Sequence, residues 1–289
     1  MNNIFSEIRN NYKVGNGFTK LLYLNLFFFV IYTIIWVPFN EIETIIKYLS
    51  FPSKTDILIH KPWTFLSYMF IHTDSLHILS NMVFLYFGSK PFLKHFNNKQ
   101  LITTYILGGI CGAIFFKLLF NLFPEYANFN SEKELIGASA GVFAIMIAAS
   151  TYRPNSLISL PFIGNIKLKY IAWSAIILFY LGIGNSPNPG GHIAHLGGAL
   201  FGYLYIKQLQ KGNDFSIGFT KWINNISNLF KPKSKLKTVH KRKKTDTQFN
   251  TEKSAQQIAV DIVLEKISKS GYESLSKEEK ATLFSASKK

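Results

Sequence analysis

Long apolar runs without charge are the feature that most limits what this chain can fold into. The first run covers residues 21–37, contains no charged side chain, and is flanked by Lys20 and Glu41. A segment of this length can cross a hydrocarbon core of roughly 30 Å. A cleavable signal peptide would have a shorter apolar core and a cleavage site of small residues, which this run lacks. The run is therefore predicted to be a retained membrane span.

Five further apolar runs follow, so the sequence predicts an all-α, polytopic membrane protein with six transmembrane helices. Charged residues make up only 17% of the chain, whereas soluble domains typically contain about 25%. The further predicted spans cover residues 76–92, 101–123, 136–152, 166–181 and 192–206. An even number of spans places both termini on one side of the membrane.

Basic residues indicate which side that is. They gather in the N-terminal segment, in the connections at residues 90–99 and 153–169, and in the tail after Lys207. The opposite connections hold mainly acidic residues, as at 124–135, or no charge at all, as at 182–191. By the positive-inside rule, both termini are cytoplasmic. We predict a multi-pass protein of a bacterial-type plasma membrane, and its net charge of +16 indicates contact with lipid rather than nucleic acid.

Composition divides the chain into four predicted parts. These are a cytosolic N-terminal segment (1–20), a membrane domain (21–209), a basic linker (210–250) and a cytosolic helical hairpin (251–289). In the last part, Ile258, Ile262, Val263 and Ile267 form a helical stripe that ends before Gly271. Ser276 and Glu279 have the spacing of a capping box that opens a second helix.

Polar residues cluster near the outer ends of three predicted spans. The second span carries His77 and Asn81, the fourth Ser139, and the sixth His195. These three spans all run from outside to inside, so the four side chains are expected at a similar depth, roughly 5 to 10 Å below the surface. Polar groups within hydrocarbon are costly and normally face a protein interior. Asp74, just before the second span, is predicted to be its N-cap.

The same four residues form a candidate catalytic site. A serine hydroxyl becomes an effective nucleophile when an imidazole removes its proton, so Ser139 is the candidate nucleophile and His195 its base. Asn81, His77 and the backbone N–H of Ser139 are candidate donors to an oxyanion. Close helix contact is allowed by small residues around the two reacting groups: Gly137 and Gly141 beside Ser139, and Gly198 and Gly202 after His195.

Residues 61–205 resemble the rhomboid family of intramembrane serine proteases. The resemblance rests on three motifs in the family's order: His72-x4-His77-x3-Asn81, Gly137-Ala-Ser139, and Ala194-His195-x-x-Gly198-x-x-x-Gly202. It implies a Ser139–His195 dyad without a third acid, an oxyanion site lined by His77 and Asn81, and no metal or other cofactor. It also implies membrane-spanning protein substrates cut near the outer boundary and entering beside the fifth span. The fifth span, residues 166–181, and the flexible loop 182–191 would then form the gate.

Three positions depart from the family's pattern. Ala140 follows the serine where glycine is usual, Phe143 replaces a tyrosine that commonly stacks on the catalytic histidine, and Thr64 replaces the arginine common after Trp63. Stacking by Phe143 on His195 is still expected. None of these changes removes a reacting group.

Three other functions compete with proteolysis. Ala140 keeps open a catalytically silent rhomboid-like protein that binds membrane spans without cutting them. A metal site of His77, His192 and His195 is disfavoured because no acidic or thiol ligand accompanies them within a span. A transporter is disfavoured because the polar cluster is shallow and the chain shows no inverted repeats. The sequence identifies no physiological substrate.

Overall fold

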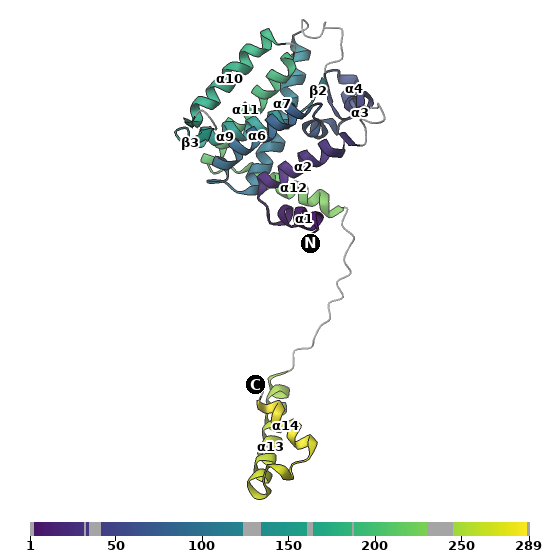
Figure 1. Cartoon of the computed structure of the whole chain (residues 1–289), viewed down its shortest axis with the longest axis vertical. Helices are drawn as coiled ribbons and strands as arrows, with labels where there is room; N and C mark the ends of the chain where they lie inside the picture. Colours follow the sequence, from purple (N-terminus) through teal and green to yellow (C-terminus); the bar gives the residue numbers. More distant parts are fainter. Residues whose placement is uncertain are drawn as a thin grey trace. The chain divides into compact units, whose positions relative to one another are not determined.

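The structure is a computed structural model that describes residues 3–31, 33–34, 42–123, 134–160, 164–186, 188–229 and 245–287. The chain divides into two compact units, Met1–Lys231 and Pro232–Lys289. Figure 1 shows that both are built mainly from helices. The first unit is a helical bundle, and the second consists of two helices joined by a short turn.

The bundle begins with α1 (Ile4–Val14), α2 (Gly17–Ile31) and α3 (Ile42–Leu49). A compact connection follows, with β1 (Phe51–Pro52), α4 (Thr55–His60), α5 (Thr64–Ser67) and the 3-10 helix η3 (Tyr68–Phe70). The remaining elements are α6 (Ser75–Phe92), α7 (Asn98–Leu122), β2 (Glu134–Leu135), α9 (Ser139–Tyr152), β3 (Leu157–Leu160), β4 (Gly164–Lys167), α10 (Leu168–Asn185), α11 (Pro189–Gln210) and α12 (Phe215–Leu229).

Six helices overlap the six predicted runs: α2, α6, α7, α9, α10 and α11. Within the described residues, α7 and α10 are long and apolar enough to cross a membrane by length and composition, while α2 and α9 are apolar but shorter. Polar residues lower the hydropathy of α6 and α11. The number of spans therefore stays a prediction, and residues 32 and 35–37 of the first run lie outside the described part of the chain.

Local sequence fixes where these helices begin. The Asp74 carboxylate accepts from the His77 backbone N–H at 2.8 Å and caps α6, which confirms the predicted N-cap. Asn97 and Gln100 form a reciprocal capping box at the start of α7. Asn188 caps α11, with Pro189 in its first turn.

The segment 182–191 differs from the predicted flexible loop. Residues 182–185 belong to α10 and residues 189–191 to α11. The prediction of a loop is therefore wrong for these residues, because the Asn188 cap and Pro189 start α11 early and the Asn185 amide donates to the Leu181 carbonyl inside α10.

The fold also contains two short strand pairs, which the prediction of an all-α fold did not include. β1 pairs antiparallel with β2, placing Phe51 opposite Leu135. β3 and β4 form a hairpin between α9 and α10. The chain is thus mostly helical, and the β1–β2 pair holds the segment that leads into α9 against the connection between α3 and α4.

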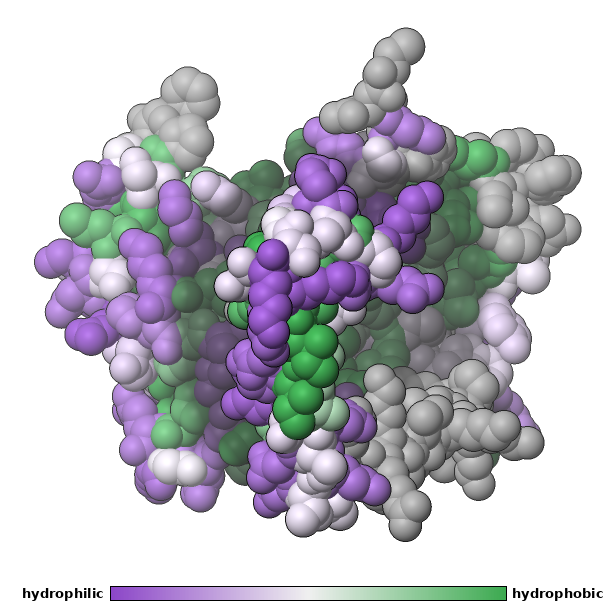
Figure 2. All heavy atoms as spheres, turned by 90° about the horizontal axis from the view of Figure 1, so that it is seen from below, coloured by the Kyte–Doolittle hydropathy of each residue, from purple (hydrophilic) through white to green (hydrophobic). Residues whose placement is uncertain are grey.

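Helix α9 is the central helix of the bundle. Every residue from Ala140 to Ser150 is buried, and α9 packs against α6, α7, α10 and α11. By contrast, α10 buries only Leu168, Ala172 and Phe179. Its exposed side chains are large and apolar, as expected for a helix that faces lipid: Tyr170, Trp173, Ile177, Leu178, Tyr180 and Leu181. Figure 2 shows the whole chain from below, with hydrophilic and hydrophobic residues side by side on the surface.

Helix α12 lies inside the range 210–250 that we predicted as a linker. It packs against α7, and Asp214 anchors its start by accepting from the Gln100 side chain at 2.9 Å, the Tyr205 hydroxyl at 3.0 Å and the Ser216 N–H at 2.8 Å. Burial raises the pKa of the Asp214 carboxyl, but these hydrogen bonds outweigh burial, so its pKa lies below the usual value. Composition alone missed this helix because its basic neighbours dominate the segment.

The second unit contains α13 (Asp246–Ser270), the 3-10 helix η4 (Tyr272–Ser274) and α14 (Lys277–Ser287). Helix α13 begins within the predicted linker, capped by Thr245. Gly271, with φ +76°, ends it. The Ser276 N–H donates to the Glu279 carboxylate at 2.7 Å and the Glu279 N–H donates to the Ser276 hydroxyl at 3.2 Å. These two hydrogen bonds confirm the predicted capping box.

Candidate active site

Ser139 and His195 lie within hydrogen-bonding distance of each other. Ser139 is the first residue of α9, and His195 lies in the second turn of α11. The Ser139 Oγ is 2.6 Å from the His195 Nε2. For Nε2 to accept the hydroxyl hydrogen, the ring proton must be on Nδ1. This pair therefore has the geometry of a nucleophile and its general base.

Glycines of α11 bring the two helices this close. A Cβ added at Gly198 would collide with the Ala140 carbonyl oxygen, and one at Gly202 would collide with that of Ala144. The backbones of α9 and α11 therefore touch along one line of small residues. His195 precedes Gly198 by three residues, on the same side of α11, so this contact sets how closely its ring approaches Ser139.

The other edge of α9 packs against α7 in a similar way. A Cβ at Gly112 would lie 2.6 Å from the Ala140 Cβ, and one at Gly108 would collide with the Ala144 Cβ. A Cβ at Gly141 would lie 2.6 Å from the Tyr105 carbonyl oxygen. The methyl group of Ala140 therefore occupies space that Gly112 leaves open. This pairing accommodates the departure from glycine after Ser139.

The remaining nitrogen of His195 faces no acid. The Nδ1 atom is buried and has no hydrogen-bond partner in the described part of the chain. Two aromatic rings hold the imidazole instead: Phe143 at 5.3 Å and Phe179 at 4.6 Å between ring centroids. Phe143 contacts His195 as expected, but the two rings are tilted by 49° rather than stacked. The arrangement is a dyad oriented by packing, without a third polar member.

His77 and Asn81 lie on the α6 side of Ser139. The His77 ring packs against the backbone just before the serine, because a Cβ at Gly137 would lie 2.7 Å from its Nε2. The Asn81 side chain is buried, and its amide donates to the His77 carbonyl oxygen at 3.0 Å. One of its two N–H groups remains for another acceptor. No hydrogen bond joins Asn81 to Ser139 among the described residues.

The turn before Ser139 supplies backbone donors. Gly137 has φ +105°, a conformation that glycine adopts readily, and its N–H donates to the Tyr68 carbonyl oxygen at 2.9 Å. The Ala138 N–H approaches the His72 Nε2 at 3.5 Å, so His72 supports the turn. The N–H groups of Ser139, Ala140 and Gly141 begin α9 and have no acceptor within the helix. They make this end of α9 suited to a developing negative charge.

The family relationship agrees with these motifs. Residues 60–211, more than half of the chain, match the sequence model of the Rhomboid domain. The chain belongs to the rhomboid family. The match contains α6, α7, α9, α10 and α11 and hence all the candidate residues. Residues 243–289 match a family of unknown function (DUF6576).

Two relatives come from Arabidopsis thaliana. A mitochondrial RHOMBOID-like protein 12 is 29% identical over 160 residues, covering 52% of this chain and 47% of that protein. RHOMBOID-like protein 7 is 28% identical over 149 residues, covering 51% of this chain and 43% of that protein. The chain thus spans about half the length of these curated relatives. The family places this chain among rhomboid-like membrane proteins.

Sequence reasoning missed several residues at this rhomboid-family site. Phe179 of α10 packs on His195, but it was one of 27 phenylalanines, and no pattern marked it. Gly108 and Gly112 of α7 pack against α9. Their small-x-x-x-small spacing is a sequence pattern that indicates such close helix contact. His192 packs against Gly182 of α10 and is 6.0 Å from His195 between ring centroids. Within the described residues, no three metal-ligating side chains come together.

Proposed function

We propose that this rhomboid-family protein is an intramembrane serine endopeptidase that cuts membrane-spanning proteins with a Ser139–His195 dyad. The observation that carries the proposal is the 2.6 Å distance between the Ser139 Oγ and the His195 Nε2, on two helices whose contact is fixed by glycines. No cofactor has a role in this chemistry.

In the first half of the reaction, the Ser139 oxygen attacks the carbonyl carbon of the scissile peptide. As the C–O bond forms, the hydroxyl proton passes to the His195 Nε2. The tetrahedral intermediate then breaks its C–N bond, and the His195 imidazolium gives its proton to the leaving amine. An ester on Ser139 remains as the acyl-enzyme.

In the second half, water attacks this ester. His195 removes a proton from the water, the C–O bond to Ser139 breaks, and the proton returns to the Ser139 oxygen. The product is a carboxylic acid, and the dyad is regenerated. The buried, unpartnered Nδ1 of His195 means that the imidazolium is stabilised by the substrate's developing negative charge and by ring contacts rather than by an aspartate.

In the tetrahedral intermediate, the oxygen of the scissile carbonyl carries a negative charge, and we propose that it lies at the start of α9. The Ser139 backbone N–H, the free Asn81 amide hydrogen and the His77 ring are its proposed donors. Support comes from the burial of Asn81 and from the position of His77 beside Gly137. Preorganised donors of this kind stabilise the transition state because they need no reorganisation during the reaction.

The proposed setting is a six-span protein of a bacterial-type plasma membrane with both termini in the cytoplasm. Its support is the distribution of Lys and Arg in the sequence. In this orientation, Ser139 lies towards the outer face. The partners are then the lipid bilayer and protein substrates with a membrane span, cut near the outer boundary, with no role for nucleic acid.

The test is a cleavage assay with a model single-span substrate in reconstituted vesicles. Ser139→Ala and His195→Ala should each abolish cleavage. The matched controls are Ser174→Ala on α10, where the exposed hydroxyl donates to the Ile171 carbonyl of its own helix, and His60→Ala in α4, whose side chain is exposed. Both controls should cut at the wild-type rate.

Two results would count against the proposal. Cleavage that survives Ser139→Ala would refute the nucleophile. A folded wild-type chain that cuts no substrate and reacts with no serine-directed reagent would be a catalytically silent rhomboid-like protein, the alternative that Ala140 keeps open.

A further inference from the structure

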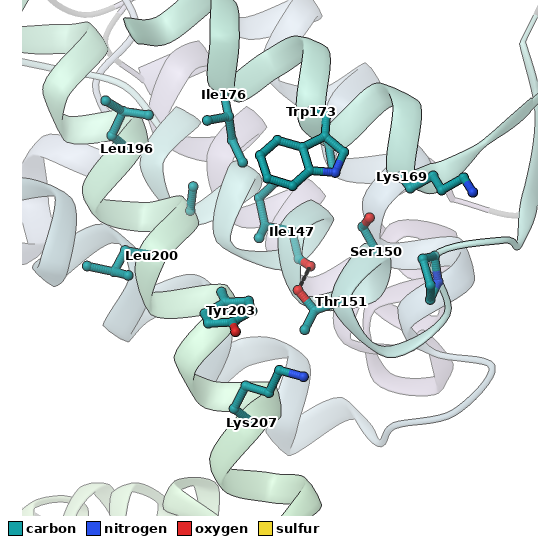
Figure 3. A pocket seen from close by; sticks show the side chains of 13 residues that line it. Ile147, Ser150, Thr151, Lys169, Trp173, Ile176, Leu196, Leu200, Tyr203 and Lys207 are labelled. Carbon is teal, nitrogen blue, oxygen red and sulfur yellow. Dashed lines mark hydrogen bonds between the residues drawn. The ribbon is translucent and has the colours of Figure 1, made fainter.

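A cavity of about 470 Å³ lies between α9, α10 and α11, away from Ser139. Neither Ser139 nor His195 lines it (Figure 3). The cavity extends to the opposite end of α9, since Thr151 and Pro154 contribute to its wall. Helix α9 has 14 residues and is therefore roughly 20 Å long. The cavity mouth and the candidate active site lie towards opposite ends of this central helix.

One part of the cavity is apolar. Its wall comes from three helices and includes Ile147, Ala172, Ile176, Leu196 and Ala199. Figure 3 shows Ile176, Leu196 and Leu200 at one side, with the indole of Trp173 above the space between α10 and α9. A surface of this kind is suited to hydrocarbon.

The other part of the cavity is polar and positively charged. Lys169 begins α10 and Lys207 is near the end of α11, and because these helices run antiparallel, both lysines reach the same end of the cavity. Ser150 and Thr151 lie between them in Figure 3. The lining contains no aspartate or glutamate. The Lys169 ammonium lies 5.3 Å from the centre of the Tyr170 ring and the Lys207 ammonium 5.6 Å from that of Tyr203. Neither lysine has a carboxylate partner in the described part of the chain.

The size of the cavity decides what can occupy it. One turn of an α-helix, about 10 Å wide and 5.4 Å tall, already fills on the order of 400 Å³. A membrane-crossing substrate helix therefore does not fit within about 470 Å³. A flexible acyl chain does fit such a space, and the two ammonium groups at its mouth, which have no carboxylate partner among the described residues, are complementary to a phosphate. Basic pockets between helices at one membrane face are typical of anionic headgroup sites.

We propose that this cavity binds one anionic phospholipid, with an acyl chain between α10 and α11 and its phosphate at Lys169 and Lys207. Such a lipid would contact α9, α10 and α11 at once. It would add apolar contacts for α10, which has few buried residues. The proposal requires only that the chain lies in a membrane, and it does not depend on proteolysis.

The test is native mass spectrometry of the full chain in a neutral detergent with added lipid. Dioleoylphosphatidylglycerol should remain bound as a single copy more strongly than dioleoylphosphatidylcholine, which has no net charge. Lys169→Gln with Lys207→Gln should weaken phosphatidylglycerol binding by about 30-fold, roughly fivefold for each lysine. Both side chains lie at the surface of the bundle, so the double variant is expected to fold.

The matched control is Lys90→Gln with Lys94→Gln. These lysines lie at the end of α6, are exposed, and lie outside the cavity lining. This variant has the same change in net charge and should bind phosphatidylglycerol like the wild type. Soluble glycerol 3-phosphate should not compete, because it lacks the acyl chain.

Three outcomes would overturn the proposal. The first is equal retention of the two lipids. The second is unchanged phosphatidylglycerol binding in the Lys169/Lys207 variant, or an equal loss in the control. The third is competition by glycerol 3-phosphate at the lipid's own concentration, which would indicate a simple anion site.

Discussion

Helix α9 meets α11 and α10 in two very different ways. Against α11, the contact is backbone to backbone, because Gly198 and Gly202 lie directly on the carbonyl groups of Ala140 and Ala144. Against α10, the contact is made by side chains, such as Phe143 with Phe179 at 4.5 Å between ring centroids. This second interface also contains a cavity of about 470 Å³.

The two interfaces differ in how strictly they position side chains. Ser139 and His195 lie on the two helices of the glycine interface, where a change of a few tenths of an ångström has no space to be absorbed. The helix beside the cavity, α10, is the one with few buried residues and many exposed apolar ones. We therefore expect changes at the α9–α11 contact to disable the dyad and changes on α10 to alter it only modestly.

The largest effect is expected from Gly198→Leu, which forces α11 away from α9. Overpacking of this kind costs about 1–3 kcal/mol of stability, and a shift of about 1 Å at the reacting atoms can cost about 100-fold in rate. Cleavage should fall by at least that factor. Gly184→Leu on α10 is the control, since no atom lies within 4 Å of its added Cβ. Equal losses in both variants would contradict the distinction.

Asn81→Ala tests the electrostatic part of the site separately from helix packing. We expect the cleavage rate to fall about 100-fold or more, as for loss of one oxyanion donor, while the thermal stability changes little. Asn185→Ala is a matched control because that amide also donates to a carbonyl four residues earlier, at 3.1 Å, on exposed α10. An unchanged rate in Asn81→Ala would remove Asn81 from the mechanism.

Phe179→Ala measures the α10 side of the comparison directly. The contact of Phe179 with His195 is an aromatic pair, worth about 0.5–1.5 kcal/mol, so the cleavage rate should fall by no more than about tenfold. Leu178→Ala, at an exposed neighbouring position, should have no effect. A loss as complete as in Gly198→Leu would show that α10 fixes the dyad as strongly as α11 does.

The smallest effect is expected at Asp214, where α11 leads into α12. Because hydrogen bonds hold the Asp214 pKa below its usual value, the stabilisation is present above the ordinary carboxyl pKa and is lost as the pH falls through the lower folded value. The protection factors of the α12 amides, which are exchange rates corrected for the intrinsic rate at each pH, should therefore fall on acidification below about pH 4.

In Asp214→Asn, we expect exchange in α12 to be about fivefold faster at neutral pH, equivalent to roughly 1 kcal/mol, with a weaker pH dependence. Asp246→Asn in the other unit is the control. If the protection factors of α12 are the same in all variants and at all pH values, then Asp214 does not anchor this helix.

The sequence predicted the helices and the residues gathered at the site better than it predicted what surrounds them. Ser139 and His195 stand out because polar groups are rare in apolar runs, and Gly198 and Gly202 because their spacing places them on one helix face. Phe179 does not stand out, since contact with His195 depends on how α10 is tilted and turned, which apolar periodicity does not specify.

The connections were the least predictable part. The segment 182–191 has glycine, proline and asparagine, typical of a loop, yet α10 continues to Asn185 and the Asn188 cap begins α11 at Pro189. Helix α12 was hidden because Gln100, which donates to Asp214 at its start, lies 114 positions earlier in the sequence. The β1–β2 pair likewise joins residues more than 80 positions apart. Such long-range contacts leave no local pattern.

The central claim is that Ser139 is a nucleophile activated by His195, and the most direct measurement is the site of reaction with a fluorophosphonate. After labelling of the full chain in membranes, peptide mass spectrometry should find the phosphonate on Ser139, and His195→Ala should lose the label while His60→Ala keeps it. A phosphonate on another residue, or undiminished labelling of Ser139 without His195, would contradict the account.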